Sequence, residues 1–197
     1  MRSRRTVTGL DVSYEDGTDR AVAAAVTLQL PTLAVVEVAL FDGRVEAPYV
    51  AGFLALREAP LLLRALEKLT IRPEVLVCDG YGIAHPRRFG LACHVGQETK
   101  LPTFGVAKTP FMATFSEPGP ERGAWSDLLD GGEVVGRALR TRAGVKPVFV
   151  SVGYGMDIDE ASDLTLALCP KYRLPECIRE ADSRSRSALR ASGQSYI

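Results

Sequence analysis

The sequence predicts an α/β fold with a mixed central sheet, antiparallel in its first three strands and then parallel, flanked by helices. Three apolar segments separated by short turns occupy residues 7–41, which is the pattern of an antiparallel meander. A later run, Val75–Cys78, is continuously apolar, as expected for a strand that is buried on both faces of a parallel sheet. The chain has 197 residues, enough for one domain, 1–197, with its own core.

The meander consists of three expected strands, at residues 7–14, 20–29 and 32–41. The pair Asp16-Gly17 follows the first of them, and Asp42-Gly43 follows the third. Aspartate followed by glycine favours a turn, because glycine adopts positive φ without steric cost. The spacing therefore predicts neighbouring strands that run in opposite directions.

The middle of the chain alternates between helices and buried strands. Leucines 62, 66 and 69 recur at helical spacing and predict a helix from Pro60 to about Thr70, with proline in its first turn. The apolar run at 75–78 follows, then an expected helix over 89–99 and a short strand over 103–107. This alternation predicts the parallel part of the sheet.

The last third of the chain is less regular. Prolines and glycines predict an exposed excursion over residues 116–132, followed by strands at 134–141 and 148–152 and a helix over 157–168. The Arg/Ser-rich segment from about 183 to 197 is expected to be a frayed tail.

Composition excludes several classes of protein. There are 24 basic and 24 acidic side chains, so any nucleic-acid binding must come from a local basic surface. Four cysteines without a C-x-x-C pair, and only two histidines, argue against structural zinc and favour a reduced, cytoplasmic protein. No signal peptide and no apolar run of about 18 residues is present, so we expect no membrane association.

Three carboxylates stand at unusual positions. Asp11 lies inside an expected strand, where it is either on the solvent face of an edge strand or a metal ligand. Asp79 ends a buried strand directly before Gly80, as a turn former or at the sheet edge where ligands bind. Glu58 precedes Pro60 and either complements a helix dipole or completes an acidic site. Together they suit a hard cation such as Mg²⁺ at a phosphodiester.

Several donors could bind nucleic acid near these carboxylates. His85, Arg87 and Arg88 follow Asp79 in a glycine-rich segment, and they suit phosphate oxygens unless they are simply solvated. Lys108 ends the strand at 103–107 and either faces the same sheet edge or solvent. Tyr49 either wedges between bases or packs on the sheet.

These residues fall in blocks that resemble the endonuclease V family, nucleases that act at inosine (deaminated adenine). The matching blocks run in the family's order over almost the whole chain: Gly9-Leu-Asp-Val-Ser-Tyr14, Pro48-Tyr49 through Arg57-Glu58, Asp79-Gly-Tyr-Gly-Ile-Ala-His-Pro-Arg-Arg-Phe-Gly90, Gly105-Val-Ala-Lys108 and Tyr172-Arg-Leu-Pro-Glu176 followed by Arg179 and Ala181-Asp182. The block from 79 to 90 is the most specific of them.

The resemblance implies a ribonuclease H-like fold and Mg²⁺-dependent cleavage, with Mn²⁺ able to substitute. The family cleaves the second phosphodiester bond 3′ to inosine and leaves 3′-hydroxyl and 5′-phosphate ends. The expected partner is inosine-containing DNA or RNA, bound by a monomer.

The same resemblance implies roles for individual residues. Asp11 and Asp79 would be metal ligands, and Glu58 and Lys108 would complete the catalytic group. Tyr49 would belong to a strand-separating wedge. The residues expected to form the pocket for the extruded base are Gly80, Gly82 and Ile83.

Three departures from the family pattern leave alternatives open. Ala51 replaces the wedge proline, and Tyr154 replaces a histidine associated with metal binding or catalysis. The chain also enters its first strand without the family's usual N-terminal helical segment. The alternatives are a catalytically weak protein that recognises inosine, or another ribonuclease H-like nuclease such as a junction resolvase.

Overall fold

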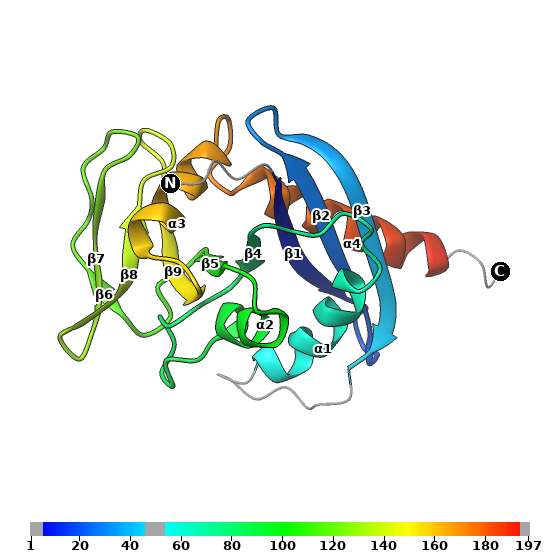
Figure 1. Cartoon of the computed structure of the whole chain (residues 1–197). Coiled ribbons are helices and arrows are strands. Elements are labelled where there is room, and N and C mark those ends of the chain that lie inside the picture. Colours follow the sequence, from blue (N-terminus) through cyan, green and yellow to red (C-terminus); the bar gives the residue numbers. More distant parts are fainter. Residues whose placement is uncertain (1–5, 46–53, 194–197) are drawn as a thin grey trace.

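The structure is a computed structural model that describes residues 6–45 and 54–193 (Figure 1). Tyr49 and Ala51 therefore lie outside the described residues, and the expected wedge stays a prediction. Within the described ranges, no helix has both the length and the apolar character needed to cross a membrane.

One nine-stranded sheet runs through the molecule in the order β3-β2-β1-β4-β5-β9-β8-β7-β6. Its strands are β1 (Thr6–Tyr14), β2 (Arg20–Gln29), β3 (Ala34–Arg44), β4 (Leu76–Asp79), β5 (Thr103–Ala107), β6 (Thr114–Phe115), β7 (Trp125–Asp130), β8 (Glu133–Leu139) and β9 (Val148–Tyr154).

The predicted meander is confirmed, since β1 pairs with β2 and β2 with β3 in antiparallel register. Strands β4 and β5 then continue the sheet in parallel with β1. The expectation that later strands are parallel holds only this far. Strands β9, β8, β7 and β6 are all antiparallel to their neighbours, because short connections join most of them.

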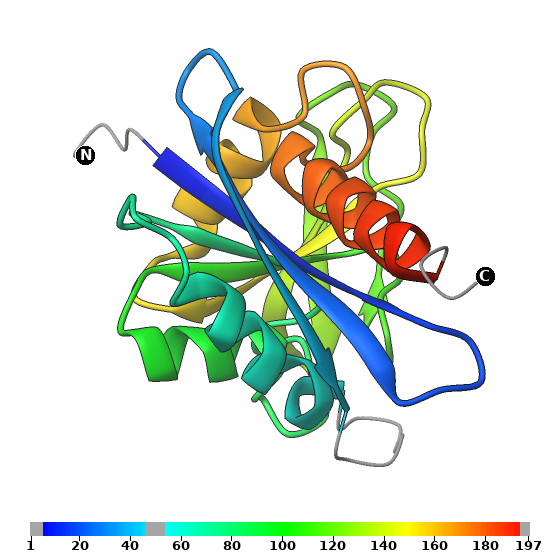
Figure 2. The same cartoon turned by 90° about the vertical axis from the view of Figure 1, so that its right-hand side faces the viewer.

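Four helices cover the two faces of the sheet (Figure 2). On one face lie α1 (Leu54–Leu66) and α2 (Leu91–Thr99), and on the other α3 (Ile158–Ala167) and α4 (Glu176–Gly193). Successive side chains of β1 point to opposite faces of the sheet. Val7 packs with α3 and α4, whereas Leu10 packs with α1 and α2. Position 11 therefore faces α4.

Helix α1 begins earlier than predicted, at Leu54, so Pro60 lies inside the helix and not in its first turn. The apolar stripe that includes Ala55, Ala59 and Leu62 packs on the sheet and outweighs the proline. The helix predicted from residue 157 is confirmed, because the Asp157 side chain accepts a hydrogen bond from the Glu160 N–H as an N-cap.

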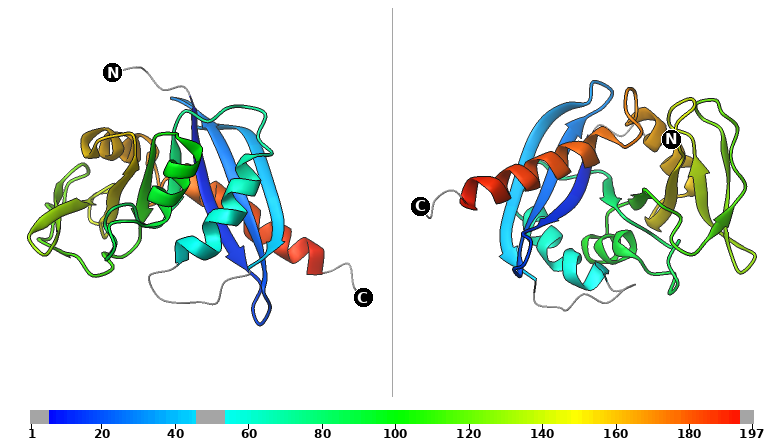
Figure 3. Two further views of the ribbon diagram at one scale, coloured as in Figure 1. Left: turned by 60° about the horizontal axis from the view of Figure 1, so that its bottom comes forward. Right: turned by 180° about the vertical axis from the view of Figure 1, so that it is seen from behind.

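The expected frayed tail is wrong for residues 183–193, which belong to α4. This helix lies across β1 and β2 (Figure 3, right) and buries one stripe, made of Cys177, Ile178, Ala181 and Ser185. Tertiary packing of such a stripe stabilises a helix whose other positions are Arg/Ser-rich. The expected excursion at 116–132 also contains regular structure, because its second half forms β7.

Candidate active site

The site starts at the point where β1 and β4 separate. The last paired residues of these parallel strands are Leu10 and Cys78, so the next residues, Asp11 and Asp79, leave the ladder side by side. Strand β1 lies between β2 and β4 in the interior of the sheet, which excludes an edge position for Asp11. Two carboxylates are thus fixed side by side where the pairing of β1 with β4 ends.

Helix α1 adds a third carboxylate from the opposite face of the sheet. The Glu58 side chain is buried, at 7% exposure, so it is not a solvated charge at a helix N-terminus. The Tyr14 hydroxyl donates a hydrogen bond of 2.8 Å to Glu58 Oε1. Tyr14 ends β1, three residues after Asp11, on the face of the sheet that α1 covers.

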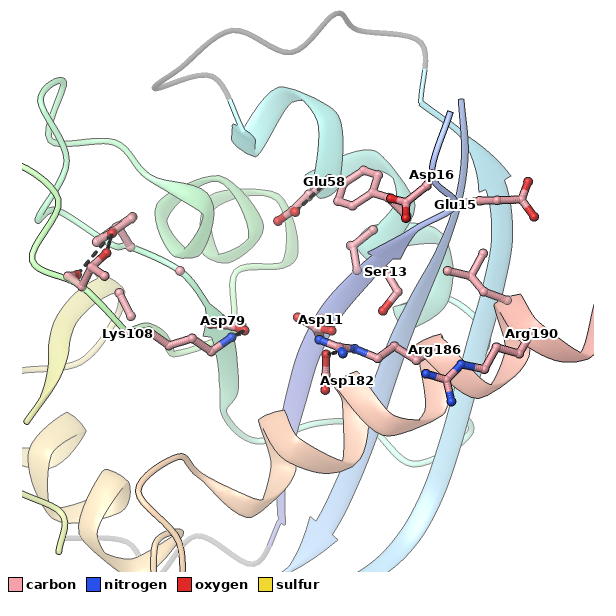
Figure 4. A pocket seen from close by; sticks show the side chains of 17 residues that line it. Asp11, Ser13, Glu15, Asp16, Glu58, Asp79, Lys108, Asp182, Arg186 and Arg190 are labelled. Atoms are coloured by element: carbon pink, nitrogen blue, oxygen red, sulfur yellow. Dashed lines mark hydrogen bonds and ion pairs between the residues drawn. The ribbon is translucent and has the colours of Figure 1, made fainter. Parts of the chain in front are cut away.

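Lys108 brings a positive charge to the same point. It follows the last residue of β5, the strand next to β4, and its ammonium group forms an ion pair with Asp79 Oδ2 (Figure 4). The pKa of Lys108 is raised, because the negative charges of Asp79 and other carboxylates outweigh partial burial, the largest single influence. The lysine therefore stays protonated beside the carboxylates.

Helix α4 supplies a fourth carboxylate, Asp182 (Figure 4). This residue lies in one of the matching blocks of the sequence, but the sequence patterns assign it no role. Gly9 makes this possible, because a Cβ at that position would lie 2.3 Å from the Cys177 carbonyl carbon. The close crossing places Ser185 over the strand, 2.7 Å from the Ser13 hydroxyl and 3.5 Å from Asp11 Oδ2. Asp182 itself accepts a 2.7 Å hydrogen bond from Arg186.

The carboxylates repel one another in this arrangement. Burial and three neighbouring carboxylates raise the pKa of Asp11 to about 8; these neighbours are Asp79, Asp182 and Glu58. Burial also raises the pKa of Glu58 to about 7, against the lowering effect of the Tyr14 hydrogen bond. Lys108 alone does not balance this cluster of negative charge.

All these groups line one open cavity of about 960 Å³. The predicted residues that the structure brings together there are Asp11, Glu58, Asp79, Gly80 and Lys108. The cavity continues along α4, where Arg186 and Arg190 form part of its wall (Figure 4).

The other predicted nucleic-acid-binding residues that the structure describes do not line this cavity. Gly82 packs against β9: its N–H donates to Ser151 Oγ, and a Cβ would lie 2.0 Å from the Val152 carbonyl oxygen. The Ile83 N–H donates to that same carbonyl. Both residues therefore fix the turn after β4, and their role in base binding stays a prediction.

The three basic side chains of this segment differ in their surroundings. His85 is buried, and its ring stacks on Phe111 with centroids 5.8 Å apart. Arg88 forms ion pairs with Asp130 at 2.6 Å and Glu133 at 2.7 Å, so its guanidinium serves the β7–β8 hairpin. The role of Arg88 in phosphate binding stays a prediction. Arg87 is exposed, and its role stays a prediction.

Tyr154 lies at the other end of β9. It is paired with Thr103, the first residue of β5, whereas Lys108 follows the last. Its ring lies 5.8 Å from the Lys100 ammonium, and its Cβ packs on Gly96 of α2. The hypothesis that Tyr154 occupies a metal position is thus wrong, and the competing interpretation, packing away from the site, is confirmed.

Comparison with known proteins agrees with this architecture. The family model for endonuclease V matches residues 1–183. The chain belongs to the endonuclease V family. An endonuclease V from Streptomyces avermitilis is 58% identical over 184 residues, which cover 93% of this chain and 80% of that protein.

Solved structures of the family confirm the predicted ribonuclease H-like fold. The crystal structure of the Streptomyces avermitilis endonuclease V superposes with a TM-score of 0.93 at 56% identity, covering 95% of this chain and 82% of the other. Endonuclease V of Ciona intestinalis, in complex with a 24-mer DNA containing an inosine followed by a ribo-adenosine, gives a TM-score of 0.82 at 29% identity, with 95% and 87% coverage.

The donor set of the site fits a hard divalent cation. Among the described residues, no group of three or more histidine, cysteine, aspartate or glutamate side chains forms a ready metal cluster. A cation between Asp11 and Asp79 would thus take two carboxylates and complete its shell with water and phosphate oxygens. This is the usual coordination of Mg²⁺ in phosphoryl-transfer sites. It would also balance the excess negative charge around Asp11.

Proposed function

We propose that this chain is a divalent-metal-dependent endonuclease that cleaves nucleic acid at the second phosphodiester bond 3′ to inosine. The products would carry 3′-hydroxyl and 5′-phosphate ends. The observation that carries this proposal is the convergence of Asp11, Asp79 and Glu58 with Lys108 in one open cavity. The inosine-containing DNA bound to the Ciona intestinalis relative supports the choice of substrate.

Asp11 and Asp79 would hold the cation, with Mg²⁺ as the physiological ion and Mn²⁺ as a substitute. Such a cation polarises the scissile phosphate and lowers the pKa of a water molecule. Both carboxylates lie directly after the last paired residues of β1 and β4, which fixes them before substrate binds, so little reorganisation is needed. Asp182 contributes further negative charge from α4 and helps to attract the cation.

Glu58 would orient the attacking water and take up its proton. A carboxylate with a pKa of about 7 suits proton transfer near neutral pH. The Tyr14 hydrogen bond fixes which oxygen of Glu58 is free for this task. Lys108 would offset the negative charge that develops on the phosphate. Its ion pair with Asp79 keeps the ammonium group beside the carboxylates that would hold the cation.

Base recognition would follow extrusion of inosine from the duplex. Extrusion costs a few kcal/mol and less at a mispaired base, which favours deaminated sites. Gly80 and Tyr81 line the catalytic cavity and would contact the extruded nucleotide together with the turn at Gly82 and Ile83. We expect the protein to act as a monomer. The four buried free cysteines fit the reducing cytoplasm.

The test is a cleavage assay with end-labelled oligonucleotides that contain one inosine, as DNA duplex, single-stranded DNA and RNA, each with Mg²⁺ or EDTA. We expect Mg²⁺-dependent cleavage at one position, absent with adenosine in place of inosine. Asp79→Asn should abolish cleavage while the protein stays folded, and Asp127→Asn on the exposed side of β7 is the matched control.

The alternatives give different results in the same assay. Inosine-dependent binding without cleavage would indicate a binding protein. Cleavage of branched DNA without any inosine requirement would indicate a resolvase-like nuclease. Either result would contradict the proposed function.

A further inference from the structure

Arg173 lies in the segment Tyr172-Arg-Leu-Pro-Glu176, to which neither the motifs nor the cavity assigns a role. Its guanidinium donates three hydrogen bonds, all to main-chain carbonyls. Nη2 donates to the carbonyls of Lys108 at 2.9 Å and Pro147 at 2.7 Å, and Nε donates to that of Lys146 at 2.9 Å. One side chain thus joins the residue after β5 to the two residues before β9.

These carbonyls belong to residues just beyond the end of the β5–β9 pairing. The last pair between β5 and β9 is Ala107 with Phe149, so Lys108 is the first residue beyond that ladder. Pro147 has no N–H and cannot donate a further ladder bond. Beyond the ladder, Arg173 supplies the hydrogen-bond donors for these carbonyls, from a planar group whose N–H bonds have fixed directions.

Arg173 is itself held in place. Its own carbonyl accepts a 2.7 Å hydrogen bond from the Thr141 hydroxyl, beyond the end of β8. The next residue, Leu174, packs against the core that α3 and α4 share with the sheet. Arg173 is therefore anchored to the core, and its guanidinium holds the Lys108 backbone at a fixed position relative to that core.

We propose that Arg173 is a positioning residue that sets the Lys108 ammonium beside Asp79 by fixing the Lys108 backbone. This inference rests on the proposed function, in which Lys108 stabilises charge at the phosphate. A small displacement of a catalytic group slows the reaction without removing any catalytic atom.

The test compares Arg173→Lys with Arg122→Lys. Arg122 also donates from Nη2 to two carbonyls, those of Leu166 at 2.8 Å and Cys169 at 3.5 Å, but these lie at the end of α3 and not at the site. In single-turnover cleavage of inosine DNA, we expect R173K to be slower by roughly tenfold or more, as misplaced catalytic groups are. Its Kd for the substrate and the rate of R122K should change by less than about twofold.

A double-mutant cycle separates positioning from a general loss of stability. In a Lys108→Ala background, R173K should cause no further loss of rate, because the group it positions is gone. An equal loss in both backgrounds, an equal loss in R122K, or failure of R173K to fold would overturn the inference. Absence of cleavage by the wild-type chain would instead refute the proposed function itself.

Discussion

The hydroxyl of Tyr14 on β1 donates a 2.8 Å hydrogen bond to Oε1 of Glu58 on α1, linking the central strand to the helix that covers it. Burial, and then the Glu58 charge, raise the pKa of Tyr14, so its hydroxyl stays protonated and remains a donor near neutral pH. This bond orients a carboxylate that is buried at 7% exposure.

Tyr14→Phe should therefore slow cleavage while the protein stays folded. We expect a loss of roughly tenfold, since a hydrogen bond to a charged group is worth about 1.5 kcal/mol or more. Single-turnover rates with saturating Mg²⁺ measure it. Tyr154→Phe is the control, because Tyr154 pairs with Thr103 at the end of β5 opposite to Lys108. Equal rates for wild type and Y14F would show that the hydroxyl does not orient Glu58.

Asp11→Asn should stabilise the apo protein, because it removes a carboxyl group that ionises readily in the unfolded chain but whose ionisation is disfavoured in the fold by burial and by other carboxylates. We expect a melting temperature about 2–4 °C higher in EDTA, the shift caused by roughly 1 kcal/mol in a domain of this size. Adding Mg²⁺ should raise the melting temperature of the wild type but not of D11N, since only the former binds the ion well.

Thermal melts of both proteins, with and without Mg²⁺, measure this difference. Asp127→Asn, at an exposed position of β7, is the control and should respond to Mg²⁺ as the wild type does. A wild-type melting temperature that does not respond to Mg²⁺ would contradict the placement of a cation at Asp11.

Tyr154→His should leave the metal requirement unchanged, although the family resemblance implies a histidine at this position. The side chain packs beside Lys100 and Gly96, at the end of β5 opposite to Lys108. Cleavage measured over a range of Mg²⁺ and Mn²⁺ concentrations should give superimposable curves for the two proteins. A lower half-saturating concentration in Y154H would place this residue in the metal site after all.

Glu37→Gln should lower stability in a pH-dependent way. Glu37 on β3 accepts hydrogen bonds from the Thr70 N–H at 2.7 Å and the Ile71 N–H at 2.8 Å, which lowers its pKa. A carboxyl with a lowered folded-state pKa stabilises the protein above its unfolded-state pKa, and this contribution is lost as the pH falls through the folded value.

The melting temperature of E37Q should therefore be below that of the wild type at pH 7, and the difference should shrink at acidic pH. Melts at several pH values below 7 measure it, with Glu98→Gln on α2 as control. A difference that is constant with pH would mean that the Glu37 charge does not stabilise the fold.

Local patterns in the sequence predict the meander, the buried strand before Asp79, and the positions of Asp79 and Lys108 directly after strands, but they leave two interpretations open for Asp11. Each depends on local signals: Asp-Gly turns, continuous apolar runs, and polar residues directly after them. The meeting of Asp11 and Asp79 depends on the parallel pairing of β1 with β4, which brings together residues 68 positions apart and is seen only in the folded chain.

Contacts between segments that are distant in the sequence bring the other residues to the site. Asp182 reaches it because α4 crosses β1 closely at Gly9, and the buried stripe of α4 contains a serine that obscures its periodicity in the sequence. Arg88 forms ion pairs with Asp130 and Glu133, which lie more than forty positions along the chain and which its own segment does not reveal. Such contacts depend on how distant segments pack, and no local pattern of residues encodes that packing.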